Sequence, residues 1–207
     1  GDVVVLAGRN GGKAHAMWRL HEAGSHVLAD KPWLVEPADL DAVRASLAGP
    51  PITAEIMTGR RDLAASVMRR LVSTTAVFGG FAEGAPGLEQ ESVHHLEKLV
   101  DGALLRRPWW YFDVRVQGSG PVDIPTHLVD QAQWMTGDDG ALPTLLSARA
   151  WSTAVPLEAF RRTTGEDAFP EALSPFVDGD ILDYRCNAEL MYGVGRITAH
   201  ARTRWVL

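Results

Sequence analysis

Apolar residues near the start of the chain form short runs that alternate with stretches of helical spacing. The run from Asp2 to Ala7 meets a Gly-rich turn, and a helix from Lys13 to Ala23 separates it from a second run, His26 to Ala29. The pattern then predicts a helix from Glu36 to Leu47 and a third strand from Ile52 to Met57. Strands that alternate with helices in this way predict a parallel sheet.

Beyond about residue 60 the pattern changes to one helix (61–72) followed by strands with period-two alternation. The clearest strands, Ile181 to Tyr192 and Arg196 to Val206, are separated by glycines and predict an antiparallel hairpin. A third strand is expected from Trp110 to Val116. The chain therefore predicts an α/β region followed by an α+β region, with a domain boundary between residues 59 and 60. The second domain should contain an open, mainly antiparallel sheet with flanking helices.

Composition and charge exclude several classes of protein but do not indicate one function. The 207 residues carry a net charge of −6, and 46% of them are hydrophobic. Cys186 is the single cysteine, which excludes an intrachain disulfide framework, and no apolar run is long enough for a membrane span. An acidic chain is a poor match for nucleic acid. We expect a cytoplasmic protein whose partner is a small molecule, with no nucleic acid and no membrane.

The first candidate for chemistry is the tripeptide Asp30-Lys31-Pro32, directly after the strand that ends at Ala29. Ligands of open α/β sheets bind beyond the carboxyl ends of the strands, and Pro32 would stiffen the backbone that holds the Lys31 ammonium there. A solvated lysine in a surface loop is the alternative.

The second candidate is the segment from Gly118 to Asp130, where Asp123 and His127 lie one turn apart at the start of a helix that begins near Pro125. A helix N-terminus disfavours imidazolium, so His127 would be neutral near pH 7, and Asp123 could orient it as a general base. The alternative reading makes Asp123 a helix cap and His127 a core residue.

Weaker candidates lie between these segments. His94-His95 and Lys98, expected on a helix, could reach a substrate, although adjacent histidines lack metal-ligand spacing. The aromatic run that includes Trp109 could form a sugar-stacking wall, although such residues more often belong to a core. Cys186 falls on the apolar face of its strand, which makes a reactive thiol improbable.

Taken in order, these segments resemble the Gfo/Idh/MocA oxidoreductases, the family of glucose-fructose oxidoreductase and inositol dehydrogenase. The segment from Ala23 to Pro32 is similar to the one that ends in E-K-P in the family, with Asp30 in place of Glu. The segment from Gly118 to Asp130 resembles the family's D-x-x-x-H-x-x-D segment. The match is most similar to a branch with a distinctive oxidoreductase C-terminal domain, and it covers nearly the whole chain.

The resemblance implies a partial Rossmann-type parallel sheet over residues 1–59 and a substrate and oligomerisation domain over residues 60–207. It implies hydride transfer between NAD or NADP and a sugar, polyol or related hydroxy compound, with Lys31, Asp123 and His127 as catalytic residues and no metal. The implied cofactor-binding residues are Ala7, Gly8, Arg9, Asn10, Asp30, Lys31 and Pro32. The implied substrate-binding residues are His95, Lys98, Trp109 and Asp130. A carbohydrate-like substrate and a homo-oligomer formed through the C-terminal sheet are expected.

One expected feature is missing from the sequence. No G-x-G-x-x-G occurs in it, although this fingerprint cradles the cofactor pyrophosphate at a helix N-terminus. We therefore expect a fragment of a longer oxidoreductase that is inactive by itself. Two alternatives stay open: a non-catalytic ligand-binding or assembly module that keeps the fold, and a metal-assisted isomerase or hydrolase that uses Asp123, His127 and His95.

Overall fold

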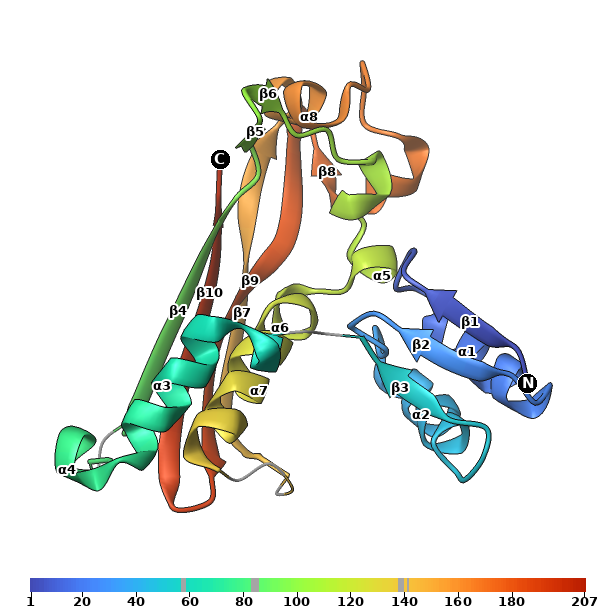
Figure 1. The fold of residues 1–207 in the computed structure, drawn as a ribbon. Helices are drawn as coiled ribbons and strands as arrows, with labels where there is room; N and C mark the ends of the chain where they lie inside the picture. Colours follow the sequence, from blue (N-terminus) through green and yellow to red (C-terminus); the bar gives the residue numbers. More distant parts are fainter. Residues whose placement is uncertain (57–58, 83–85, 138–139, 141) are drawn as a thin grey trace.

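The computed structural model places two sheets side by side (Figure 1) and describes residues 1–56, 59–82, 86–137, 140 and 142–207. We name residues 1–56 the parallel-sheet region and residues 59–207 the mixed-sheet region. The elements of the parallel-sheet region are β1 (Val3–Leu6), α1 (Lys13–Glu22), β2 (His26–Ala29), the 3-10 helix η1 (Pro37–Asp39), α2 (Leu40–Ser46) and β3 (Thr53–Glu55).

The parallel-sheet region follows the predicted alternation. Its strands pair in parallel in the order β1-β2-β3, and α1 and α2 pack on each other and on the sheet. The side chains that join these layers are aliphatic and buried: Ala14, Met17, Val27, Ala29, Ala42 and Val43. β1 lies at one edge of the sheet, where Val3 and Val5 are 61% and 59% exposed. Met57 of the predicted third strand lies outside the described residues.

The mixed-sheet region contains a sheet with the order β4-β10-β9-β7, and β8 pairs with β9. Its strands, with a separate two-stranded β5–β6 sheet, are β4 (Leu88–His95), β5 (Leu99–Val100), β6 (Ala103–Leu104), β7 (Thr144–Pro156), β8 (Val177–Asp178), β9 (Ile181–Val194) and β10 (Ile197–Val206). The β9–β10 hairpin is confirmed. β7 and β8 are antiparallel to β9, whereas β4 is parallel to β10.

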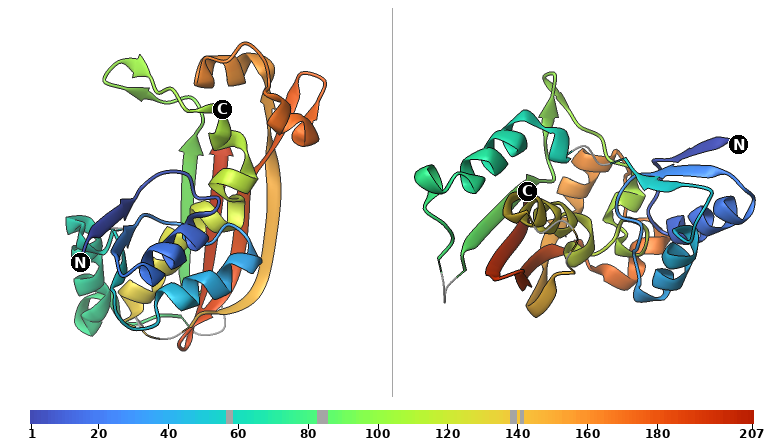
Figure 2. Two further views of the ribbon diagram at one scale, coloured as in Figure 1. Left: turned by 90° about the vertical axis from the view of Figure 1, so that its right-hand side faces the viewer. Right: turned by 60° about the horizontal axis from the view of Figure 1, so that its bottom comes forward.

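The helices of the mixed-sheet region are η2 (Gly59–Arg61), α3 (Leu63–Ser73), α4 (Thr75–Phe78), η3 (Trp109–Phe112), α5 (Val114–Gln117), α6 (Gly120–Asp123), α7 (Pro125–Thr136), α8 (Leu157–Thr164) and η4 (Glu171–Phe176). The helices α3, α6 and α7 lie on one face of this sheet, and α8 lies at its upper end (Figures 1 and 2). Leu128 and Ala132 of α7 pack against Tyr192 of β9 and Ala201 of β10. This contact buries the apolar side of α7.

An aromatic core fills the end of the sheet beyond α6. Phe160 lies with its ring 5.2 Å from the ring of Phe112, which in turn lies 5.2 Å from Tyr184. Cys186 belongs to the same buried cluster, and burial raises the pKa of its thiol to about 11. The expectation that Cys186 lies on the buried face of its strand is confirmed.

Two local predictions are wrong. The expected strand from Trp110 to Val116 is instead the helical turn η3 followed by α5, because Asp113 caps α5 by accepting a hydrogen bond from the Arg115 amide. The expected helix around His94 is the strand β4, because β10 supplies a parallel partner along its whole length. The β10 partner is not visible from local sequence, whereas the Asp113 cap lies two residues from Arg115.

The predicted fold class is confirmed: a parallel three-stranded sheet precedes a mainly antiparallel sheet with flanking helices. The domain boundary between residues 59 and 60 stays a prediction. In the part of the chain that the structure describes, no helix is long and apolar enough to cross a membrane.

Charged side chains pair between strands on the polar face of the mixed sheet. Arg202 of β10 binds Glu189 of β9 at 3.0 Å, and Arg204 of β10 binds Glu91 of β4 at 2.8 Å. These opposite charges therefore pair within one chain.

Close backbone contacts connect the two regions. The Gly11 amide donates to the Val116 carbonyl at 2.7 Å, and a Cβ added to Gly11 would lie 2.8 Å from the Arg115 oxygen. Within the mixed-sheet region, a Cβ at Gly120 would collide with the backbone oxygen of Asn187, so α6 sits directly on β9. Glycine at position 11 thus allows the loop after β1 to approach α5 closely, and glycine at position 120 allows α6 to approach β9.

Candidate active site

The site is centred on an ion pair between the two regions. Lys31, directly after β2, donates from Nζ to Asp123 Oδ1 at 2.6 Å and to the Asp123 carbonyl at 3.1 Å. The two side chains are only 17% and 9% exposed. The carboxyl end of a parallel strand and the end of α6 therefore bring a lysine and an aspartate together that are 92 residues apart in sequence.

His127 lies in the first turn of α7, half-buried, beside this ion pair. Burial lowers the pKa of its imidazole, the positive charge of Lys31 lowers it further, and the negative charge of Asp123 opposes both effects. Among the described residues, no hydrogen bond joins the Asp123 carboxylate to the His127 ring. The Asp123 carboxylate instead accepts a hydrogen bond from Lys31. The orientation of His127 by Asp123 stays a prediction.

The turn after β1 presents three of the predicted cofactor residues to solvent. Ala7, Gly8 and Arg9 are exposed, and the Arg9 guanidinium lies 5.3 Å from the centre of the Trp110 ring. Asp30 accepts the Lys31 amide through Oδ1 at 2.9 Å, and a cis peptide bond joins Lys31 to Pro32.

Asn10 is buried and has a structural part in this turn. Its side-chain amide donates to the Gln117 carbonyl at 2.8 Å, and its Oδ1 accepts Lys13 Nζ at 2.7 Å. Lys13 also donates to the Asp30 carbonyl at 2.8 Å, and burial lowers the pKa of its ammonium. Lys13 was not among the predicted site residues; its position three residues after Asn10, at a helix start, is the signal that could have singled it out.

His94 is a second residue that the predicted site set omits. Its ring stacks on Trp205 with centroids 4.7 Å apart, and its Nε2 lies 2.8 Å from Ser92 Oγ. Burial lowers its pKa, and the charges of both Asp123 and Lys31 act on it. Period-two alternation within β4 separates the half-buried His94 from the exposed His95, so treating this segment as a strand would have chosen His94.

The predicted substrate residues do not form one surface. His95 and Lys98 are exposed near the end of β4, whereas Trp109 packs against the aromatic core. Asp130, on α7, is held by two groups of Arg60, with the shortest contact 2.6 Å. Their substrate roles stay predictions.

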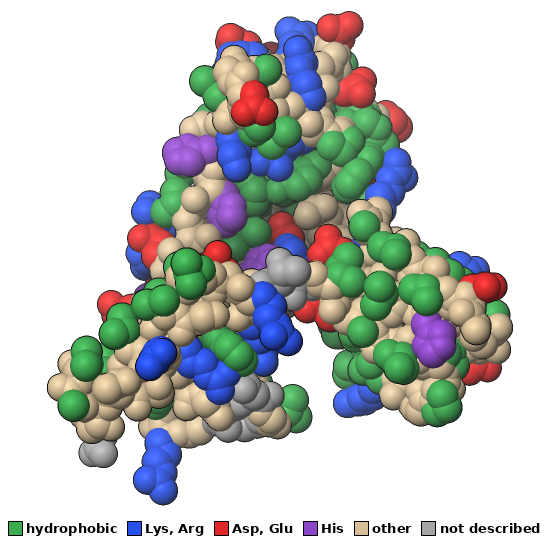
Figure 3. Space-filling model, viewed as in Figure 1, with side chains coloured by type: hydrophobic (Ala, Val, Ile, Leu, Met, Phe, Trp, Pro, Cys, Tyr) green, Lys and Arg blue, Asp and Glu red, His purple; other side chains and the backbone are tan. Residues whose placement is uncertain are grey.

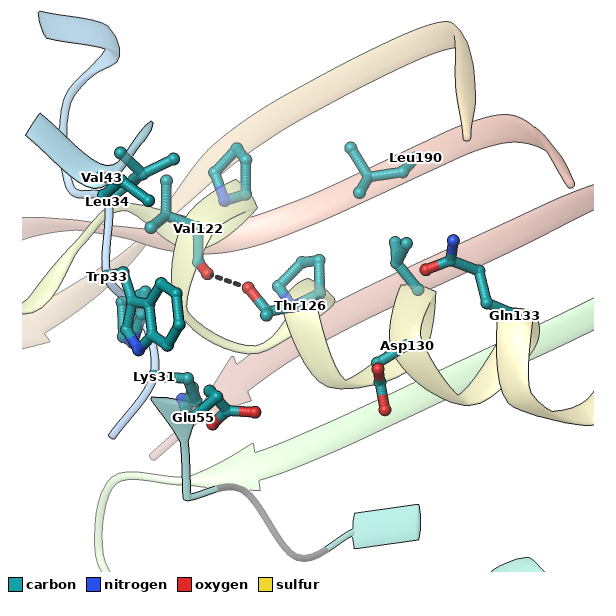
Figure 4. A pocket seen from close by; sticks show the side chains of 14 residues that line it. Lys31, Trp33, Leu34, Val43, Glu55, Val122, Thr126, Asp130, Gln133 and Leu190 are labelled. Carbon is teal, nitrogen blue, oxygen red and sulfur yellow. Dashed lines mark hydrogen bonds between the residues drawn. The ribbon is translucent and has the colours of Figure 1, made fainter. Parts of the chain in front are cut away.

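A pocket of about 630 Å³ lies next to the Lys31–Asp123 pair, between the loop after β2 and the exposed side of α7 (Figure 4). Trp33, Leu34 and Val43 form the wall on the parallel-sheet side, and Val122, Thr126 and Leu190 lie opposite. Figure 3 shows acidic, basic and His side chains meeting in the recess between the two regions. The pocket is thus largely apolar, with charged groups at its inner end.

The metal-assisted alternative needs His95 beside Asp123 and His127. His95 is instead exposed and alternates with His94, which faces the site. Within the described ranges, no three His, Cys, Asp or Glu residues are gathered closely enough to hold a metal ion.

Solved structures of dehydrogenases have the same fold. The WlbA dehydrogenase from Chromobacterium violaceum, in complex with NADH and UDP-GlcNAcA, matches 98% of this chain over 48% of its own, at 15% identity and a TM-score of 0.58. A levoglucosan dehydrogenase matches 98% of this chain over 48% of its own, at 19% identity and a TM-score of 0.60. The chain thus has a fold that these two dehydrogenases share.

A more similar structure, a "putative oxidoreductase" from Parabacteroides merdae, is 35% identical, with a TM-score of 0.92 over 99% of this chain and 49% of that one. The family profile described as "Putative oxidoreductase C terminal domain" matches residues 67–207. The chain belongs to this family. It spans about half the length of the solved structures that it matches. A comparison with curated proteins found no match.

Proposed function

We propose that the complete protein is an NAD(P)-dependent oxidoreductase of the Gfo/Idh/MocA type that oxidises a carbinol group of a sugar, polyol or related hydroxy compound. The observation that carries this proposal is the Lys31–Asp123 contact of 2.6 Å beside a half-buried histidine of lowered pKa. Removal of a hydroxyl proton requires a neutral base that accepts the proton and a cation that stabilises the negative charge on the oxygen. The imidazole and the lysine can fill these two roles. The dehydrogenases that share the fold support the same class of reaction.

The loop after β1 fits the nicotinamide end of such a cofactor. A Cβ at Gly8 would meet no atom within 4 Å, so open space lies above the exposed backbone from Ala7 to Arg9. These residues, with Asp30 and Lys31, would hold that end of the cofactor. A bound nicotinamide would supply the hydride acceptor. The G-x-G-x-x-G fingerprint, which cradles a cofactor pyrophosphate, is missing from the sequence.

Proton transfer falls to the chain's own residues. In the oxidation direction, the carbinol carbon gives up a hydride, the hydroxyl proton passes to His127 Nδ1 or Nε2, and a carbonyl group forms. Lys31 donates a hydrogen bond to the reacting oxygen and stabilises the negative charge that develops there. Because burial and Lys31 both keep the pKa of His127 low, the imidazole is neutral and ready to accept that proton near pH 7.

Asp123 acts on both partners by its charge. Its carboxylate holds the Lys31 ammonium at 2.6 Å, which restricts where that ammonium can point. The same charge raises the pKa of His127 against the effect of burial and so stabilises the imidazolium that forms during oxidation. Asp123 is therefore a positioning residue for Lys31 and an electrostatic partner for His127.

The test compares the complete protein with its Lys31→Ala and His127→Ala variants in hydride transfer from a panel of sugars and polyols to NAD and NADP. Each variant should lower kcat by about 10²-fold or more while leaving nicotinamide binding largely unchanged, because general acid–base groups contribute on that scale. His15→Ala on α1, where the side chain is 56% exposed, is the matched control and should keep parent activity.

Turnover close to that of the parent in either variant would contradict the catalytic assignment. Binding of a sugar by a complete protein that transfers no hydride with either cofactor would favour the non-catalytic module instead. The missing fingerprint is the sequence observation behind that second candidate.

A further inference from the structure

A second pocket, of about 450 Å³, lies at the end of β4 and carries an unusual set of charges. His94, His95, Glu97, Lys98 and Arg107 line it. Figure 3 shows His side chains beside Lys and Arg side chains at the upper end of this strand. A basic pocket stands out on a chain whose net charge is −6.

Among the residues that the structure describes, the two cations of this pocket have no carboxylate partner. Arg107 stacks over Tyr111, 4.4 Å from the ring centre, and makes long hydrogen bonds of 3.4 and 3.5 Å to backbone carbonyls. In the described part of the chain, no carboxylate oxygen lies within 4 Å of the Arg107 guanidinium or of Lys98 Nζ. The acidic residue of the pocket, Glu97, is bound by Arg162 at 2.6 Å.

The pocket lies close to the candidate active site at His94, which lines it. The charges of Asp123 and Lys31 in the candidate active site act on the His94 ring, as do the charges of Arg107 and Lys98. The charges of Arg107 and Asp123 also both act on Tyr111, over whose ring the Arg107 guanidinium lies. The two sites are therefore neighbours in the fold.

We propose that this pocket binds the anionic group of an acidic sugar, a carboxylate or a phosphate, whose carbinol group reacts at Lys31 and His127. The identity of the ligand as substrate rests on the function proposed above. Arg107 offers a planar set of N–H donors that matches either anion, and its stacking on Tyr111 holds that plane in place. Lys98 adds a mobile point charge at the rim.

The test measures binding by calorimetry to the complete protein with three probes: glucuronate, glucose 6-phosphate and glucose. At least one acidic sugar should bind more tightly than glucose, and its binding should weaken as ionic strength rises. Lys98→Gln should raise the Kd of that acidic sugar about threefold to tenfold and leave glucose unchanged, as expected for loss of one partly exposed charge contact. Tighter binding of glucuronate would identify a carboxylate, and tighter binding of glucose 6-phosphate a phosphate.

Two further variants keep the result interpretable. Lys98→Arg should restore binding, and Arg44→Gln, which removes an exposed charge from α2, should not affect it. Because Lys98 is exposed, its variants should fold like the parent. Arg107→Lys keeps the positive charge but loses the planar donors, so it should weaken binding of the acidic sugar more than Lys98→Gln does. Equal binding of all three probes, or equal effects of Lys98→Gln and Arg44→Gln, would overturn the proposal.

Turnover separates this proposal from the previous one. Hydride transfer with equal kcat/KM for glucuronate, glucose 6-phosphate and glucose would keep the oxidoreductase and overturn the anion pocket as a substrate site. Charge-dependent anion binding without any hydride transfer would keep the anion pocket and overturn the oxidoreductase.

Discussion

The parallel-sheet region and the mixed-sheet region are built on different cores. In the first, alanines, valines and one methionine join two helices to three short strands, and Val3 and Val5 of β1 stay exposed. In the second, interlocking aromatic rings fill one end of a sheet whose strands reach 14 residues. A side chain buries more apolar area when it is aromatic, so each buried ring of the mixed-sheet core is expected to contribute more hydrophobic stabilisation than a buried alanine or valine of the parallel-sheet core.

The two regions also contribute different residues to the candidate active site. The parallel-sheet region supplies the cation, Lys31, on a loop beyond a strand, whereas the mixed-sheet region supplies Asp123 and His127 at the ends of two helices. The region with the smaller core side chains thus carries one half of the site, and its contacts with the other region set the geometry.

The largest expected effect tests the difference between the cores. Phe160→Ala should lower the free energy of unfolding by about 3 to 5 kcal/mol, because Phe160 is fully buried against Phe112 and Phe169. Met17→Ala in the parallel-sheet region should cost about 2 to 3 kcal/mol, since Met17 is also fully buried but packs against smaller side chains. Urea unfolding of the three proteins gives both values.

Phe78→Ala is the matched control, because Phe78 lies on α4 with 39% of its surface exposed and should contribute about 1 kcal/mol or less. A cost for Met17→Ala equal to or above that for Phe160→Ala would contradict the difference between the two cores.

A smaller effect is expected where the two regions meet. Asn10→Ala removes the bond to the Gln117 carbonyl and the acceptor of the buried Lys13 ammonium, and should cost about 2 kcal/mol. Because both bonds tie the β1 turn to its surroundings, hydrogen exchange of the β1 and β2 amides should accelerate more than that of β9. Asn10→Asp keeps the acceptor for Lys13 and should lose less stability than Asn10→Ala. If hydrogen exchange accelerated equally in β1, β2 and β9, the two regions would open as one unit, which would contradict a local effect at the β1 turn.

The smallest effect is a pH dependence that belongs to the mixed-sheet region. Burial lowers the pKa of His94 and His127 below 6.5, so between 6.5 and the lowered values the unfolded chain binds more protons than the folded one. Stability is therefore full above 6.5 and falls as the pH is lowered through this window. His94→Gln should show a smaller loss on acidification than the parent in urea unfolding, and the exposed His95→Gln a loss like that of the parent. Equal losses in parent and His94→Gln would contradict the assignment.

Local pattern was sufficient for much of the fold. The alternation of β1, α1 and β2, the β9–β10 hairpin and the buried stripe of α7 all follow from periodicity and from Gly or Pro at the ends of elements. Lys31 was also accessible, because its place after a parallel strand is a positional rule of such sheets. These features depend on residues that are close together in the chain.

Tertiary structure decided the rest. β4 is a strand because β10, more than a hundred residues later, pairs with it, and that pairing places His94 rather than His95 on the half-buried side of the strand. The same holds for Asp123, which binds Lys31 across 92 residues of sequence although its nearest predicted partner was His127. Periodicity reports which face of an element is buried; it does not report what lies opposite that face, because the partner's position depends on the packing of the whole chain.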